Sequence, residues 1–105
     1  MSNPLQGKSA IVAGGAKNLG GLISTTLATQ GVNIAVHYNS DSSEADANKT
    51  VAAVEAAGAK AVKFQGDLTI PSNVERLFDT VVDAFGSVDI AVNTVTFGII
   101  WHVFL

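Results

Sequence analysis

In this 105-residue chain, a short apolar run leads into a glycine-rich turn in Ser9-Ala-Ile-Val-Ala-Gly-Gly-Ala-Lys-Asn-Leu-Gly-Gly21, and this segment is the strongest indication of the fold. The first five residues are typical of a short parallel strand that is covered on both faces. The turn then holds four glycines in eight positions, before a helical pattern begins. Glycine permits close backbone approach, and the first turn of a helix offers unpaired N–H groups and a positive dipole end. We therefore expect this turn to bind phosphate; the alternative is a tight turn that needs glycine for its geometry alone.

Strands and helices alternate along the rest of the chain. Short apolar runs predict strands at residues 9–13, 32–37, 61–65 and 88–93. Helical spacing of apolar residues predicts helices at 19–30, at about 43–57 with a possible capping box at Ser43-x-x-Asp46, and from the capping box Ser72-x-x-Glu75 to the residue before Gly86. This alternation predicts an α/β fold with a doubly wound parallel sheet. Because parallel crossovers are right-handed, the expected spatial order of the strands is third, second, first, fourth.

Each predicted helix carries one apolar face. The residues expected to face the sheet are Leu19, Ile23 and Leu27 in the first helix, Ala47, Val51 and Val54 in the second, and Val74, Leu77, Phe78, Val81 and Phe85 in the third. The third pattern is the clearest match to the i, i+3, i+4, i+7 template. These faces predict a packed core, in keeping with a hydrophobic content of 48%.

Composition excludes several classes of protein. A net charge of −3, with six Lys and Arg residues scattered along the chain, argues against a nucleic-acid surface. The absence of cysteine excludes disulfides and thiolate sites, and the two histidines are too far apart in the sequence to suggest a metal site. The N-terminal residues lack the apolar stretch of a secretory signal, and no apolar run is long enough to cross a bilayer. We expect a soluble, cytoplasmic protein with no membrane partner.

The chain is expected to form a single domain over residues 1–105 with an atypical apolar tail at 96–105. On a monomer this tail would expose a large apolar patch, which normally marks an interface. We therefore expect a homo-oligomer that associates through residues 97–105.

The pattern Gly14-x-x-x-Asn18-x-Gly20 identifies the turn more closely. A P-loop is excluded because Gly21-Leu22 follows, where that motif requires Lys and then Ser or Thr. The turn resembles that of the short-chain dehydrogenase/reductase family, T-G-x-x-x-G-x-G, with Ala13 and Asn18 as departures from the family pattern. Asn tolerates left-handed backbone better than other non-glycine residues. Two further segments support the resemblance: Gly66-Asp67-Leu68, and Asn93 after the fourth strand.

This resemblance implies a Rossmann-like fold that binds a dinucleotide. The implied phosphate contacts are Gly14, Lys17, Asn18, Leu19 and Gly20. Asp67 and Leu68 would hold the adenine, with Asp67 as an ordinary turn residue being the alternative, and Asn93 would lie near the nicotinamide-side ribose.

Cofactor choice depends on the end of the second predicted strand. The family's discriminating acid would fall near Tyr38, where no carboxylate stands, while Asn39, Ser40 and Lys17 are suited to a 2′-phosphate. Asp41 argues the other way, toward the 2′-hydroxyl of NAD. The resemblance favours NADP over NAD, and the alternative is an ordinary polar loop.

The family's catalytic Tyr-x-x-x-Lys pair does not occur in these 105 residues, and no catalytic residue is assigned. We interpret the chain as the dinucleotide-binding part of an NADP(H)-dependent oxidoreductase acting on a carbonyl or alcohol, truncated and inactive by itself. One alternative is a non-catalytic nucleotide-binding or assembly module. Another is a flavodoxin-like mononucleotide binder, because βα alternation alone does not distinguish doubly wound families.

Overall fold

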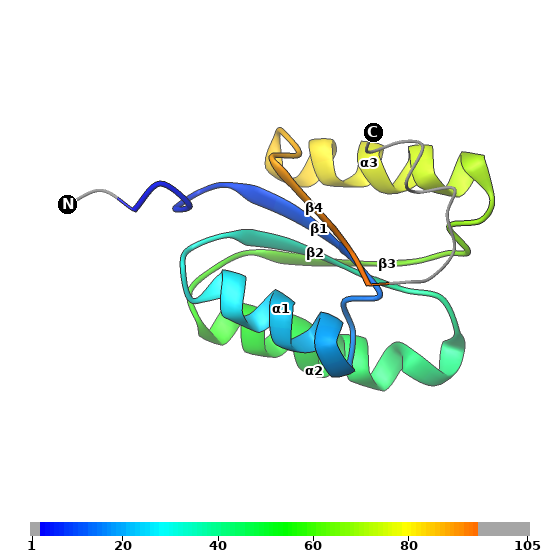
Figure 1. Cartoon of the computed structure of the whole chain (residues 1–105), viewed down its shortest axis with the longest axis horizontal. Helices are drawn as coiled ribbons and strands as arrows, with labels where there is room; N and C mark the ends of the chain where they lie inside the picture. The colour runs from blue at the N-terminus through cyan, green and yellow to red at the C-terminus, as the bar shows by residue number, and fades with distance from the viewer. Residues whose placement is uncertain (1–2, 95–105) are drawn as a thin grey trace.

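The computed structural model describes residues 3–94 (Figure 1). Along this part of the chain the elements are β1 (Ser9–Ala13), α1 (Asn18–Ala28), β2 (Asn33–Tyr38), a short 3₁₀ helix η1 (Asp41–Ser43), α2 (Glu44–Ala56), β3 (Ala61–Gln65), α3 (Pro71–Phe85) and β4 (Ile90–Asn93). Each predicted strand and helix is present, with ends that differ by one or two residues. The apolar tail at 96–105 lies outside the described residues.

The sheet has the strand order β3-β2-β1-β4, and all three neighbouring pairs are parallel. This confirms the predicted order and the doubly wound α/β class. Helices α1 and α2 cover one face of the sheet and α3 covers the other (Figure 1). Because all the strands are parallel, the carboxyl ends of the four described strands lie along one edge of the sheet. Ligands bind at this edge in open α/β sheets.

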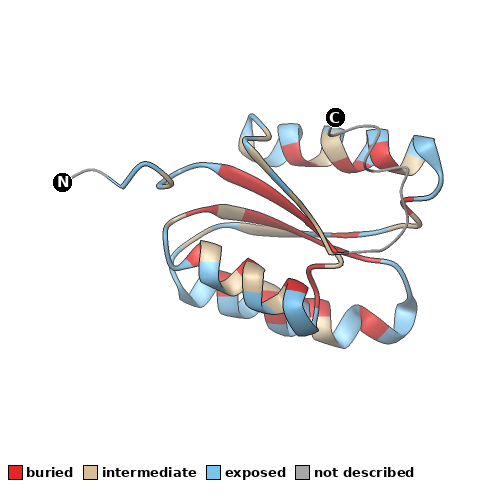
Figure 2. Cartoon of the chain, viewed as in Figure 1, coloured by how far each residue is buried: buried red, intermediate tan, exposed pale blue. Residues whose placement is uncertain are grey.

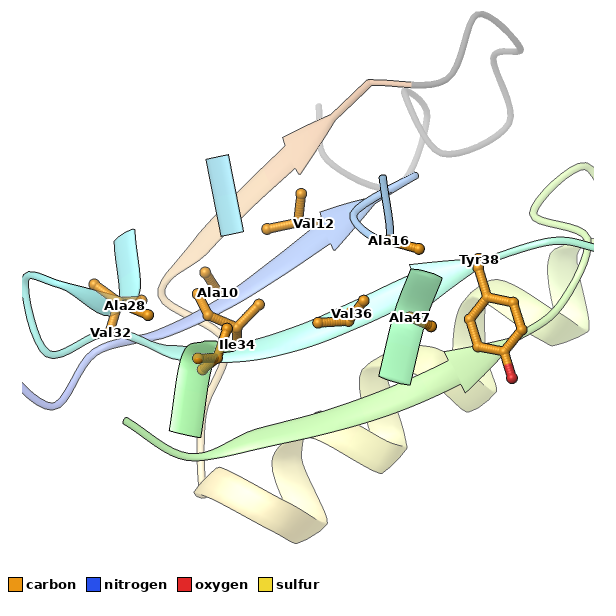
Figure 3. Close-up of a cluster of buried hydrophobic side chains, with 10 residues drawn as sticks. Ala10, Val12, Ala16, Ala28, Val32, Ile34, Val36, Tyr38 and Ala47 are labelled. Atoms are coloured by element: carbon orange, nitrogen blue, oxygen red, sulfur yellow. The ribbon is translucent and has the colours of Figure 1, made fainter. Parts of the chain in front are cut away.

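Alternate side chains of the central strands enter two separate cores. In β1, Ala10 and Val12 belong to the cluster under α1 and α2, whereas Ile11 and Ala13 belong to the cluster under α3. The first cluster continues along β2 to Tyr38 (Figure 3). All five residues of β1 are buried, as Figure 2 shows by colour. Burial on both faces explains why these strands read as apolar runs without polar alternation.

The two predicted capping boxes are wrong. Helix α3 begins at Pro71 with Ile70 before it, so Ser72 lies inside the first turn and no side chain caps the helix. Proline suits the first helical position because its φ is preset and its missing N–H would have no helical partner. Helix α2 follows η1 directly, and Ser43 makes no capping bond. In both cases the local backbone before the helix, rather than the serine, determines where the helix begins.

The predicted inward face of α1 is also partly wrong. Leu19 is 62% exposed, and the buried residues of this helix are Gly20, Ser24 and Ala28. Ile23 and Leu27 only flank the core. Small residues form the buried stripe because the helix packs very close to the strand and its turn, and periodicity of large apolar residues cannot detect such a stripe. The faces predicted for α2 and α3 are confirmed.

Replacing Leu77 by alanine should destabilise the protein far more than replacing Leu19. Leu77 is fully buried in α3, so we expect Leu77→Ala to lower the free energy of unfolding by about 2–5 kcal/mol. Leu19→Ala, on an exposed side chain, should change it by no more than about 0.5 kcal/mol. Urea unfolding followed by circular dichroism measures both. Similar losses of unfolding free energy for the two variants would contradict the exposed position of Leu19 on α1.

Candidate functional site

The glycine-rich turn lies at the carboxyl edge of the sheet, between β1 and α1. The neighbours of β1 are β2 on one side and β4 on the other, and their crossover helices pack on opposite faces (Figure 1). Such a reversal leaves an open crevice at the strand ends, which is the usual ligand position in doubly wound folds. The predicted turn therefore lies where the topology favours binding.

Close backbone contact accounts for the glycines. Gly14 has φ of 72°, and a Cβ on Gly20 would collide with the carbonyl oxygen of Gly14. A Cβ on Gly15 would lie 2.7 Å from the carbonyl oxygen of Val12. Asn18 has φ of 55°, which confirms the expected left-handed residue at that position. Helix α1 thus begins in direct contact with the turn.

Three hydroxyl side chains, one from the adjoining helix and two from distant parts of the chain, donate hydrogen bonds to carbonyl oxygens of the turn and its flanks. They are Ser24 to Gly15 at 3.1 Å and to Gly20 at 2.9 Å, Thr50 to Ala16 at 2.6 Å, and Thr94 to Ala13 at 2.6 Å. The backbone N–H of Thr94 also donates to Ala13 at 3.1 Å. These bonds fix the turn from α1, α2 and the end of β4. Sequence reasoning missed all three residues, because a lone Ser or Thr carries no pattern.

A fourth fixed point is His37, at the end of β2. Its Nδ1 accepts a hydrogen bond from the N–H of Gly14 at 2.9 Å, and its Nε2 lies 2.7 Å from the carbonyl oxygen of Gly66. The ring is 2% exposed, and burial lowers its pKa below 6.5, against the opposing effects of the Gly66 bond and the Asp67 charge. One signal in the sequence could have identified His37, namely a polar residue at a strand position expected to be buried.

The N-terminus of α1 lacks the usual means of stabilisation. Lys17 precedes the helix, no side chain caps it, and its first turn holds no acidic residue. The first N–H groups of a helix have no intrahelical partner, and they form its positive end. A lysine at this place makes the region more positive still. This arrangement favours a bound anion.

A pocket of about 240 Å³ opens at this helix terminus. Its lining residues are Gly14, Lys17, Asn18, Leu19, Gly20 and Thr94. The structure thus brings together all five residues that were expected to contact phosphate, and adds Thr94.

A second pocket, of about 160 Å³, lies beside the end of β2. Its lining residues are Gly14, Ala16, Lys17, His37, Tyr38, Asn39, Ser40 and Ser43, so no carboxylate is among the described residues around it. Tyr38 is only 4% exposed, and its hydroxyl donates to Glu44 at 3.2 Å. Burial, followed by this carboxylate, raises the pKa of Tyr38. Asp41 accepts a hydrogen bond from the Gln65 side chain at 2.6 Å.

The remaining predicted residues lie further along the same edge. Asp67 Oδ1 accepts from the N–H and the hydroxyl of Thr69, at 2.9 and 2.6 Å, and these bonds lower the pKa of Asp67. The structure therefore gives Asp67 the turn role that was one of its two interpretations. Leu68 packs in the core under α3, and Asn93 pairs in register with Ala13. Neither pocket described above is lined by these three residues.

Two kinds of feature are absent from residues 3–94. No group of three His, Asp or Glu side chains is arranged to hold a metal ion there. None of the helices in that range has the length and apolar character needed to cross a membrane.

The family model described as short chain dehydrogenase matches residues 8–103, nearly the whole chain. The chain belongs to the short-chain dehydrogenase family. 3beta-hydroxysteroid dehydrogenase 1 of Eggerthella lenta is 39% identical over 93 residues, which are 89% of this chain and 35% of that protein. The short-chain dehydrogenase/reductase homolog YusS of Bacillus subtilis is 37% identical over 86 residues, and the match covers 82% of this chain and 77% of YusS.

Solved structures agree with this family assignment. A protein of Burkholderia cenocepacia described as a dehydrogenase, with bound NADP, superposes with a TM-score of 0.84 at 52% identity. The match covers 89% of this chain and 36% of that one. A short chain dehydrogenase of the same species in complex with NADP gives a TM-score of 0.76 at 40% identity, covering 83% of this chain and 35% of its own. This short-chain dehydrogenase chain thus spans about a third of the length of most of these relatives.

Substituting alanine at Gly20 and at Gly21 should separate close contact from helix propensity. Gly20→Ala places a methyl group against the turn backbone, so we expect a loss of about 1–3 kcal/mol in the free energy of unfolding. Gly21→Ala is the matched control, because its Cβ would meet its nearest neighbour at an ordinary 3.4 Å. There the gain in helix propensity should leave the protein unchanged or up to about 1 kcal/mol more stable. Thermal unfolding of both variants checks this, and equal stabilities would contradict the contact.

Proposed function

We propose that this chain forms the dinucleotide-binding part of an NADP(H)-dependent oxidoreductase, which transfers hydride between the nicotinamide and a carbonyl or alcohol substrate. The observation that carries the proposal is the start of α1, an uncapped helix terminus with Lys17 beside it that opens into a glycine-lined pocket. An anionic pyrophosphate would accept from the unpaired N–H groups there. Gly14, Asn18, Leu19 and Gly20 contact it in this proposal.

Preference for NADP over NAD rests on the second pocket. Lys17, Asn39 and Ser40 offer a cation and two polar side chains to a 2′-phosphate, next to the buried Tyr38. An NAD-specific site instead places a carboxylate on the ribose 2′-hydroxyl. The carboxylate that the sequence suggested for this role, Asp41, is hydrogen-bonded to Gln65. The NADP bound in two structural neighbours gives further support.

The rest of the cofactor would follow the strand ends. We propose that Asp67 accepts from the adenine amino group with the carboxylate lone pairs that Thr69 does not use, and that the N–H of Leu68 donates to the ring. Asn93, beside Ala13 at the end of β4, would lie near the nicotinamide-side ribose. All of these contacts require one extended ligand that crosses the ends of β3, β2, β1 and β4.

Hydride transfer requires groups that this chain does not supply. Because the Tyr-x-x-x-Lys pair implied by the family resemblance is missing from the 105 residues, we propose that the chain binds cofactor without catalysing reduction. A non-catalytic nucleotide-binding module remains the second candidate, favoured by the apolar residues 97–105 as a docking segment. Carbonyl reduction by the purified chain would contradict the inactivity in both proposals.

NADPH should raise the melting temperature of the chain, and Lys17→Ala should reduce that effect. Losing the cation next to the second pocket should weaken NADPH binding about fivefold to tenfold, and NADH binding less, because NADH lacks the 2′-phosphate. Lys60→Ala is the charge-matched control, since Lys60 precedes β3 and therefore lies at the opposite edge of the sheet. Isothermal titration calorimetry gives the six affinities of the unaltered chain, Lys17→Ala and Lys60→Ala for NADPH and NADH.

Two outcomes would count against the proposal. If neither NADPH nor NADH at millimolar concentration raises the melting temperature or gives a binding isotherm, the dinucleotide function is wrong. If Lys17→Ala weakens both cofactors equally, the 2′-phosphate role of Lys17 is wrong.

We also propose that the chain self-associates through residues 97–105, which include seven apolar side chains. Contiguous apolar surface of this kind drives association. Sedimentation velocity should give an oligomer for the intact chain and a smaller species for a chain that ends at Thr96. A monomeric intact chain would contradict this.

A further inference from the structure

His37 makes three hydrogen bonds that join β2 to two separate loops. Its backbone carbonyl accepts from the N–H of Gly15 at 2.9 Å, and its Nδ1 accepts from the N–H of Gly14 at 2.9 Å. Its Nε2 lies 2.7 Å from the carbonyl oxygen of Gly66, the residue before Asp67. One buried residue therefore fixes Gly14 and Gly15, the first two residues of the glycine-rich turn that is proposed to bind phosphate, and also the start of the loop after β3.

The partners of the ring dictate where its proton lies. A backbone N–H can only donate, so Nδ1 must carry a free lone pair toward Gly14. A carbonyl oxygen can only accept, so Nε2 must carry the hydrogen toward Gly66. The neutral form with hydrogen on Nε2 is the one state of the ring that satisfies both bonds.

We infer that His37 is a positioning residue for the dinucleotide, which in its neutral form holds Gly14 of the phosphate turn and Gly66 of the adenine-side loop at a fixed separation. This inference rests on the proposed function, because both loops are assigned to the same ligand. His37 would act through the backbone of these loops, although its ring also lines the second pocket. A protonated ring would turn a second N–H toward the N–H of Gly14, and the hydrogen bond that holds the turn would be lost.

Two charged groups lie near the ring. Asp67 on the loop after β3 favours the cation, and Lys17 is the charged residue that lines the second pocket together with His37. Tyr38 follows on the same strand, and Arg76 of α3 lies over the ring of Phe64, the register partner of His37 in β3. Burial is the largest effect, and it keeps the pKa of His37 below 6.5. The fixing bond is therefore fully present above pH 6.5 and is lost as the pH falls through the lowered pKa.

The test measures NADH affinity for the 105-residue chain and two variants, from pH 7.5 down to the pH at which the His37 ring gains a proton, which an NMR titration of the ring locates. NADH is the probe because the 2′-phosphate of NADPH itself titrates near pH 6 and would occupy the same pocket. His37→Asn keeps an oxygen acceptor near the position of Nδ1 and does not titrate. His37→Leu removes both ring bonds but still fills the buried space with a side chain, here an apolar one.

We expect the NADH dissociation constant of the unaltered chain to rise as the pH falls through the lowered pKa of His37, because the hydrogen bond to Gly14 is then lost. His37→Asn keeps the bond to Gly14 but loses the one to Gly66, so it should bind less tightly than the unaltered chain and more tightly than His37→Leu at pH 7.5, and it should lack most of this pH dependence. His37→Leu should bind about tenfold more weakly at pH 7.5. A histidine with a purely structural role would not produce a pH profile that His37→Asn removes.

A second measurement uses the ring itself and does not depend on the folding of any variant at position 37. Long-range ¹H–¹⁵N spectra of a His102→Asn chain, in which His37 is the remaining histidine, should give the Nε2-protonated tautomer at pH 7.5. A proton on Nδ1 at that pH would overturn the inference, as would equal pH profiles for the unaltered chain and His37→Asn. Absence of NADH and NADPH binding at pH 7.5 would instead overturn the proposed function, and this inference with it.

Discussion

The contact between Gly20 and the carbonyl of Gly14 is the constraint on which the rest of the site depends. It brings the first turn of α1 against the end of β1, closer than any side chain would allow. The same approach aligns the helix so that Ser24, one turn later, reaches the carbonyls of both Gly15 and Gly20. It also leaves Leu19 outside the core and at the mouth of the pocket. If α1 packed further from β1, it would not bury a stripe of small residues, and its positive N-terminus would not border the pocket next to Gly14.

The parts of the fold that could be predicted from the sequence are those marked by runs of apolar residues or by apolar residues at helical spacing. Two-sided burial makes the central strands β1 and β2 apolar runs, and right-handed crossovers then leave a single expected strand order. The phase of α3 was clear because large residues such as Leu77 mark it. The phase of α1 was not, because Gly20 and Ser24 bury a stripe that hydropathy does not weigh. The starts of α2 and α3 were predicted to within one residue, but the two capping boxes were wrong, because η1 and Pro71 set the backbone there and no side chain caps either helix.

The residues of the site also fall into those that a sequence pattern predicts and those that it does not. Residues within one contiguous motif, from Gly14 to Gly20, were predicted to lie together and do so at the start of α1. The residues that fix the motif come from three other elements: His37 from β2, Thr50 from α2 and Thr94 after β4. Each is a single polar residue in an otherwise ordinary context, so only the three-dimensional arrangement gives it meaning. Asp67 differs again, since its carboxylate first stabilises its own turn and any ligand would share it with Thr69.

The pairing of β1 with β4 has a consequence for how the chain reaches this state during synthesis. Strands β1, β2 and β3 with α1 and α2 follow one another in sequence and can assemble as they leave the ribosome. Thr94, by contrast, meets Ala13 across 81 positions, and Asp89 meets Ser9 across 80. Closing so long a loop costs more entropy than pairing adjacent segments, so β4 is expected to dock last. The anion pocket would then gain its final wall only when translation has passed the fourth strand.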